Sequence, residues 1–119
     1  EGKRIIESGS NSNGSYVKWE DGTMICRKYI NFGDVAVTTS WGSMYETAEP
    51  LDCGDYAQPF VSDPDVSIMP MNTFFVEKKH NTTTKTSWGS FWVCRGASYD
   101  KYLAKVSCIA IGRWKAEEE

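Results

Sequence analysis

The sequence has little of what catalytic and metal sites are usually built from. It contains one histidine, His80, in 119 residues, and it lacks the Gly-x-Ser-x-Gly elbow that presents a nucleophilic serine. Aspartates in predicted loops could pair as glycosidase carboxylates, but four acids in loops are expected by chance. They could also bind Ca²⁺, but their spacing matches no dedicated calcium loop. We therefore expect a protein that is not an enzyme and that uses no cofactor and no metal. The loop aspartates are Asp52, Asp55, Asp63 and Asp65.

Paired cysteine motifs are also missing. The four cysteines are Cys26, Cys53, Cys94 and Cys108. No Cys-x-x-Cys pair occurs, which argues against zinc, and three of the four lie in apolar strand-like runs where a free cysteine acts as a small hydrophobic residue. Two disulfides in any of three pairings are possible, but we predict reduced, buried thiols, as in a bacterial cytoplasm. Cys53 is expected to be the most exposed.

The chain has no long apolar run and no excess of basic residues. The net charge is -3, with 13 Lys and Arg against 16 Asp and Glu. Membrane insertion needs a much longer apolar segment, and binding to nucleic acid needs a basic stripe. We expect neither a membrane nor a nucleic acid as partner.

Short runs of strand-forming residues, separated by turn residues, occur throughout the chain. No segment repeats its apolar residues with the period of a helix. Asp21-Gly22 lies between two runs of strand formers and predicts a tight hairpin with a two-residue type I′ turn. The segment 49–59 has no period and is predicted to be a loop. The sequence thus predicts an all-β fold, an antiparallel β-sandwich of about six to seven short strands without a long helix. The predicted strands are residues 16–20, 23–30, 34–40, 66–70, 74–79, 91–95 and 103–111, with a short strand-like stretch at residues 86–87.

The composition of the two ends predicts three parts. Residues 1–13 combine a charged opening with a Ser, Asn and Gly-rich stretch, which is typical of the end of a stem followed by a flexible joint. Residues 14–115 form the predicted β-sandwich head. Residues 116–119 are predicted to be a solvated acidic tail. We interpret the chain as a piece of a longer protein.

The last predicted strand is apolar on both faces. Val106, Cys108 and Ala110 alternate with Ile109 and Ile111. The second apolar row predicts either a central position in the sheet or burial against a neighbouring subunit.

Two sequence blocks resemble the C-terminal domains of phage tail-fibre and receptor-binding proteins. They are NSNGSYVKWEDGTMIC, residues 11–26, and CIAIGRWK, residues 108–115. The resemblance implies a homotrimeric head on an upstream fibre stem, assembled in the bacterial cytoplasm and acting at the tip of the virion's tail fibre. Its partner would be a bacterial surface glycan or protein receptor. A structural tail or baseplate module without a receptor site is the alternative.

A second pattern is similar to the H-type lectins, which are small trimeric β-sandwiches. It rests on Phe60, residues 64–68, residues 91–94 and residues 106–111. This resemblance implies a sugar site in the loop before the last strand, although the loop here lacks that family's Trp-His pair. An aromatic ring can stack on a sugar while polar neighbours bond its hydroxyls, so an H-type-like lectin outside phage is a further alternative. The candidate residues are Ser98, Tyr99, Asp100, Lys101 and Tyr102.

A second candidate patch contains Trp41 and Tyr45. Its Ser-Trp-Gly-Ser sequence at residues 40–43 is echoed at residues 87–90. Glycine after tryptophan lets the backbone turn while the indole projects. The tryptophans would serve either as a binding platform or as plugs that close an end of the sandwich.

Overall fold

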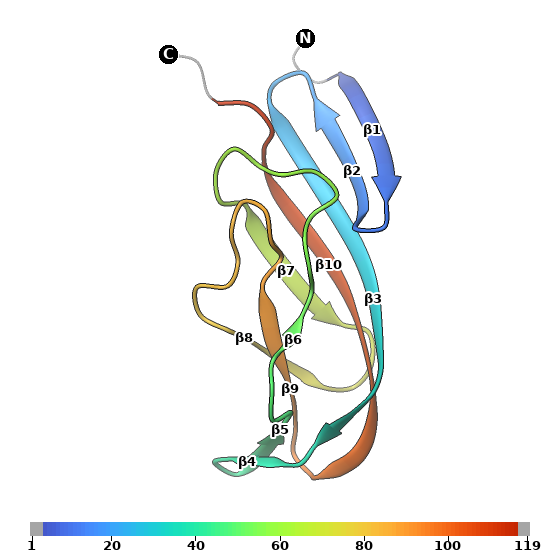
Figure 1. Ribbon diagram of the computed structural model, residues 1–119, viewed down its shortest axis with the longest axis vertical. Helices are drawn as coiled ribbons and strands as arrows, with labels where there is room; N and C mark the ends of the chain where they lie inside the picture. Colours follow the sequence, from blue (N-terminus) through green and yellow to red (C-terminus); the bar gives the residue numbers. More distant parts are fainter. Residues whose placement is uncertain (1–3, 117–119) are drawn as a thin grey trace.

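The computed structural model describes residues 4–116, which fold into two antiparallel β-sheets packed face to face (Figure 1). The molecule is elongated, with extents of 52 × 25 × 19 Å. The first sheet has the order β1 (Ile5–Asn11), β2 (Gly14–Trp19), β3 (Thr23–Val37), β10 (Tyr99–Arg113) and β7 (Asp65–Pro70). The second has β4 (Thr39–Trp41), β5 (Met44–Glu46), β9 (Ser90–Arg95) and β6 (Leu51–Asp52), with β8 (Phe75–Lys78) also pairing with β9. The all-β sandwich class predicted from the sequence is confirmed.

The hairpin of β2 and β3 is present where the sequence predicts it, but its turn differs. Three residues, 20–22, connect the strands, and the amide of Gly22 donates a hydrogen bond of 3.0 Å to the carbonyl of Trp19. Gly22 has φ +100°, whereas Asp21 does not have the positive φ that a type I′ turn needs. The Asp21 carboxylate instead accepts the amide of Thr23 at 2.9 Å. The predicted two-residue type I′ turn is therefore wrong, because the aspartate stabilises a three-residue loop.

The long strands β3 and β10 form the backbone of the first sheet. They pair from Thr23 with Arg113 to Val37 with Tyr99, with irregularities in the register near both Tyr102 and Ala104. The predicted strands 23–30 and 34–40 are thus one strand as far as Val37, with a break at Thr38. β10 is central, because β3 and β7 flank it. The sequence predicted either a central position or burial against a neighbouring subunit for this strand, which is apolar on both faces, and the first of these is observed.

Residues 5–11 form an edge strand. β1 pairs with β2 from Ile5 to Asn11, and the amide of Asn13 bonds the side chain of Asn11 at 2.8 Å in the connecting turn. Residues 1–13 were predicted to be the end of a stem and a flexible joint. Within them, residues 5–11 are a hydrogen-bonded strand of the sheet. Residues 1–3 and the acidic residues 117–119 lie outside the described part of the chain.

The core lies between the two sheets and contains three of the four cysteines, Cys26, Cys53 and Cys108. All four thiols are free and buried, which includes Cys53 at 1% exposure. The expected exposure of Cys53 is therefore wrong: it directly follows β6 and belongs to the core, and its carbonyl oxygen accepts a hydrogen bond from Lys28 Nζ at 2.7 Å. Trp88 is fully buried and stacks edge-on with Tyr56 at 4.8 Å between ring centroids. Trp88 thus acts as a plug. Residues 4–116 include no helix that could span a membrane.

Candidate functional site

The predicted sugar loop lies at the start of β10. Ser98 precedes the strand, and residues 99–102 are its first four. Ser98, Asp100 and Lys101 are exposed, whereas Tyr99 and Tyr102 are half-buried. The loop thus presents polar side chains to solvent, while its two aromatic rings turn toward the protein.

Arg95 holds these two rings in place. Its guanidinium lies 5.1 Å from the ring centroid of Tyr99 and 5.0 Å from that of Tyr102, within the range of cation–π attraction. It also donates to the Tyr99 hydroxyl at 2.9 Å and to the carbonyl of Thr73 at 2.6 Å. The Tyr102 hydroxyl donates to the same carbonyl. Both tyrosines have structural partners, so Ser98, Asp100 and Lys101 are the residues of this loop whose side chains are exposed to a ligand.

The structure separates Trp41 from Tyr45. Ser40 pairs with Tyr45, and Trp41 pairs with Met44, and residues directly opposite each other share a face of the sheet. Tyr45 packs against the core, whereas Trp41 remains 43% exposed on the outer face. Trp41 is therefore exposed on the outer face, whereas Tyr45 is partly buried on the core side.

Trp41 lines a pocket on the outer face of the second sheet. The pocket encloses about 320 Å³, at the lower end of the range of about 300–1,000 Å³ typical of small-molecule sites. Its walls are mostly apolar, and the Phe75 side chain is 65% exposed. Its lining residues are Trp41, Met44, Phe75, Val76, Glu77 and Cys94.

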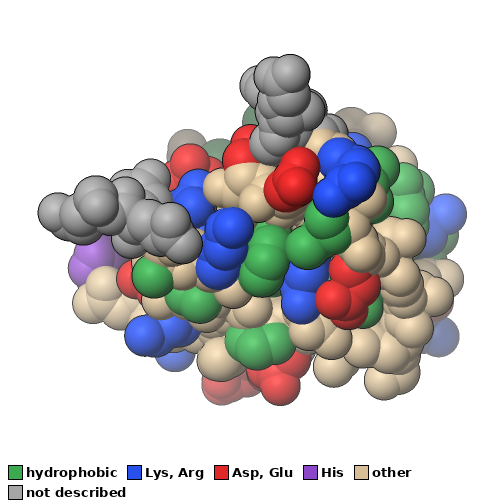
Figure 2. Space-filling view, turned by 90° about the horizontal axis from the view of Figure 1, so that it is seen from above, with side chains coloured by type: hydrophobic (Ala, Val, Ile, Leu, Met, Phe, Trp, Pro, Cys, Tyr) green, Lys and Arg blue, Asp and Glu red, His purple; other side chains and the backbone are tan. Residues whose placement is uncertain are grey.

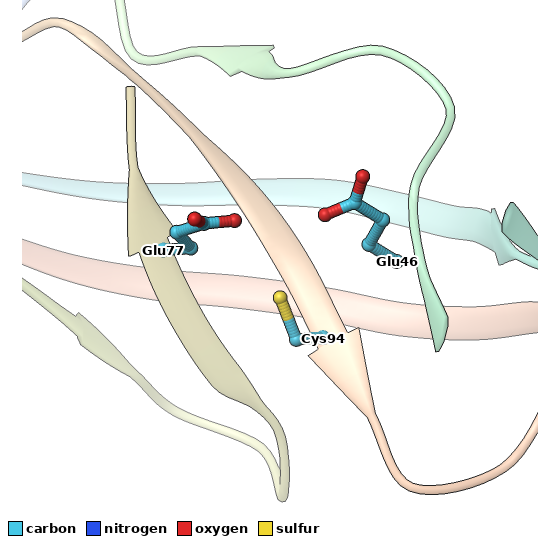
Figure 3. Close-up of side chains that lie close together, drawn as sticks. All are labelled: Glu46, Glu77 and Cys94. Carbon is cyan, nitrogen blue, oxygen red and sulfur yellow. The ribbon is translucent and has the colours of Figure 1, made fainter. Parts of the chain in front are cut away.

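Two carboxylates meet beside this pocket. Cys94 on β9 pairs with Glu46 of β5 on one side and with Phe75 of β8 on the other. Glu46 and Glu77 therefore flank the Cys94 thiol, as Figure 3 shows, and the carboxylate oxygens and Sγ lie within 4.8 Å of one another. Within residues 4–116, neither carboxylate takes part in a salt bridge. The pocket thus has a negative rim.

The Cys94 thiol is protonated at neutral pH. Burial, together with the negative charges of Glu77 and Glu46, raises its pKa to about 11. A metal ion would need the thiolate as its ligand. The group is thus two carboxylates beside a neutral thiol, and an ion bound among them would displace the thiol proton.

Among residues 4–116, the opposite end of the molecule carries charges of both signs. Figure 2 looks onto the end from which β1 departs, and there acidic and basic side chains alternate with apolar ones. Arg4 and Glu20 form a salt bridge of 3.2 Å, and Lys18 and Glu7 form another of 3.6 Å. The face in view is mixed in charge, without a basic stripe.

Sequence reasoning found only one lining residue of the pocket, Trp41. The alternation of Phe75 and Glu77 in a predicted strand was a signal that both side chains share one face. Nothing local in the sequence shows that β5 and β8 lie on either side of β9. The meeting of Glu46 with Glu77 depends on that long-range pairing.

Comparisons with known proteins bear on the fold. No protein-family model matches the sequence, and no curated protein matches it significantly. Among solved structures, the chain is similar to an N-truncated R1-type pyocin tail fiber, with a TM-score of 0.52 and 14% identity. The match covers 90% of this chain and 86% of that one. The fold is therefore similar to that of this tail fiber, and the lectin resemblance finds no support in these comparisons.

Proposed function

We propose that this chain is a non-catalytic tip domain of a phage or prophage tail fibre that recognises a receptor on the host cell as a homotrimer. The receptor is a bacterial surface glycan in this proposal. The domain would assemble in the bacterial cytoplasm, join an upstream fibre stem and act outside the cell as part of the virion.

One observation carries the proposal. A tail fibre matches this fold over 90% of the chain, and the sequence blocks that resemble tail-fibre proteins form β2, the start of β3 and the end of β10. These elements are hydrogen-bonded neighbours in one sheet. Sequence and fold thus point independently to the same class of protein.

The arrangement of the molecule suits a tip. β1 begins and β10 ends at one end of the long axis, whereas β4, β5 and the start of β10 lie at the other (Figure 1). A stem joined to the N-terminal side would therefore leave Trp41, Asp100 and Lys101 at the far end. Trp41, which is 43% exposed in the single chain, would there be available to a receptor. In a purely structural module a neighbouring tail protein would cover it.

The outer face of the first sheet supports the trimer. Ile111 pairs with Ile25, and Ser107 lies between Tyr29 and Met69. Tyr29 is 71% exposed and Met69 is 54% exposed. We call the outward-facing Ile25, Tyr29, Met69, Ile109 and Ile111 the apolar row, although Arg27, Ser67 and Ser107 lie among them. Exposed apolar side chains gathered on one sheet face mark an interaction surface. Three sites on one rigid head would gain about 10²–10⁴ in avidity over a single site.

The test is binding of the purified chain to a panel of bacterial cells, with the oligomeric state measured by light scattering. We expect a trimer that binds saturably, and a monomeric form that binds far more weakly because avidity is lost. Asp100→Ala and Lys101→Ala report on the predicted sugar loop, since both side chains are exposed and their loss should not disturb folding.

A folded trimer that binds no cell in the panel but binds other tail proteins would favour the structural module. A stable monomer under all conditions would contradict the proposal itself.

A further inference from the structure

The pocket beside Trp41 has an aromatic, apolar wall and a negatively charged rim, and together these select a particular ligand. Trp41 and Phe75 offer exposed aromatic surface, and Met44 adds an apolar floor. Aromatic rings stack on the C–H faces of sugar rings and also attract cations. A ring that has an apolar C–H face and also carries a positive charge would both stack on these aromatic rings and be attracted to them.

The rim supplies the complementary charge. Glu46 and Glu77 lie on either side of Cys94 with their oxygens within 4.8 Å of its Sγ and of each other (Figure 3). The two negative charges repel each other, and within the described range no lysine or arginine forms a salt bridge with either. An ammonium group placed between them would relieve this repulsion and donate hydrogen bonds to both carboxylates.

We propose that this pocket binds an amino-sugar residue of the receptor glycan through its protonated amine. The sugar ring would stack on Trp41, and the ammonium group would donate hydrogen bonds to Glu77 and Glu46. The pocket volume of about 320 Å³ suits a single sugar residue rather than a long chain. This inference rests on the proposed function and names the ligand class of its receptor.

The same features exclude close alternatives. An acidic sugar would bring a third negative charge to Glu46 and Glu77 and would be repelled. An N-acetylated sugar keeps the ring but loses the positive charge, so it would keep stacking and lose the charge-assisted hydrogen bonds. The amine is thus the recognised group.

The experiment uses two probes that differ only in this group. The full chain is titrated by calorimetry with a glucosamine tetramer and with its fully N-acetylated counterpart. We expect the glucosamine tetramer to bind roughly tenfold or more tightly, because hydrogen bonds to charged groups are the stronger ones. Its affinity should fall as salt is added.

Two variants and one control locate the binding. Glu77→Gln keeps the shape of the side chain and removes its charge, and Trp41→Ala removes the stacking surface. Each should weaken binding of the glucosamine tetramer roughly tenfold or more. Glu49→Gln changes an exposed glutamate that does not line the pocket and should leave binding unchanged. Near-UV circular dichroism verifies that each variant is folded.

Several results would overturn the inference. Equal binding of the two tetramers, absence of binding, or an unchanged affinity in folded Glu77→Gln would each do so. Equal binding of a tetralysine peptide would show a general cation site and not a sugar site.

Cell binding separates this inference from the proposed function. If the trimer binds cells and Glu77→Gln and Trp41→Ala bind them equally well, the receptor site lies elsewhere and only the amino-sugar inference fails. If the wild-type chain is monomeric and binds no cell, the tip-domain proposal fails.

Discussion

At the scale of single residues, Gly14 sets the geometry of the β1–β2 turn. It has φ +111°, and a Cβ at this position would lie 2.2 Å from the carbonyl oxygen of Arg27. A side chain would therefore strain the backbone and push β2 away from β3. We expect Gly14→Ala to lower the free energy of unfolding by about 1–3 kcal/mol, measured by urea denaturation at fixed chain concentration.

Gly96→Ala is the matched control. Gly96 has no positive φ, and a Cβ there would meet no atom within 4 Å. Its effect should remain within about 0.5 kcal/mol. A Gly14→Ala variant as stable as the control would contradict the described turn.

Cys94 gives the stability a dependence on alkaline pH. Its pKa in the folded protein is about 11, against an ordinary value of 9.0. Because the unfolded chain loses this proton first, the contribution of Cys94 is complete below pH 9.0 and is lost as the pH rises toward about 11. Urea unfolding across this window should show a steeper loss of stability in the wild type than in Cys94→Ala. Parallel curves would show that the thiol is not perturbed by burial and by its two glutamates.

At the scale of elements, the sequence predicts strands that are long or sharply bounded. β7 and β9 match segments 66–70 and 91–95 closely, because each alternates between faces and ends at turn residues. β4, β5 and β6 were not predicted as separate strands, since elements of two or three residues are too short for a period to show. β1 was missed because its polar, glycine-containing sequence is stabilised by pairing with β2 and not by its own preferences.

The candidate site was harder to predict than the fold. Trp41 could be found because tryptophan beside glycine in a turn is visible locally. Burial of Tyr45 depends on which face of β5 meets the core, and Tyr99 is held by Arg95 through a contact between β9 and β10. Pairings between distant strands place Glu46 beside Glu77, and no short-range pattern encodes them.

Arg95 connects β9, β10 and the segment before β8. Its two side-chain hydrogen bonds and its position over two tyrosine rings require a planar, forked cation. We expect Arg95→Lys to lower the free energy of unfolding, because lysine cannot make both hydrogen bonds while lying over both rings. Thermal and urea unfolding measure the loss. Arg27→Lys, at an exposed arginine of β3, should change stability by less than about 0.5 kcal/mol. If Arg95→Lys is as stable as the wild type, the tyrosines do not depend on this residue for their positions.

At the scale of the whole molecule, the two sheets have different outer faces. That of the second sheet has a pocket with a negative rim, which suits a small ligand. That of the first sheet is broader and holds an apolar row along β3, β10 and β7. A ligand site and a subunit interface can therefore coexist on one domain without competing for the same surface.

If the outer face of the first sheet is the subunit interface, substitutions on it should disrupt the trimer without unfolding the single chain. Tyr29→Lys combined with Met69→Lys places two charges on the apolar row, at side chains that are 71% and 54% exposed in the single chain. Because the fold does not bury these side chains, we expect the variant to keep its circular dichroism spectrum while light scattering shows a monomer. Val61→Lys, at a side chain that is 43% exposed outside this row, should remain a trimer. A trimeric double variant would move the interface to another face, because two desolvated lysines are not accommodated in an apolar contact without large cost.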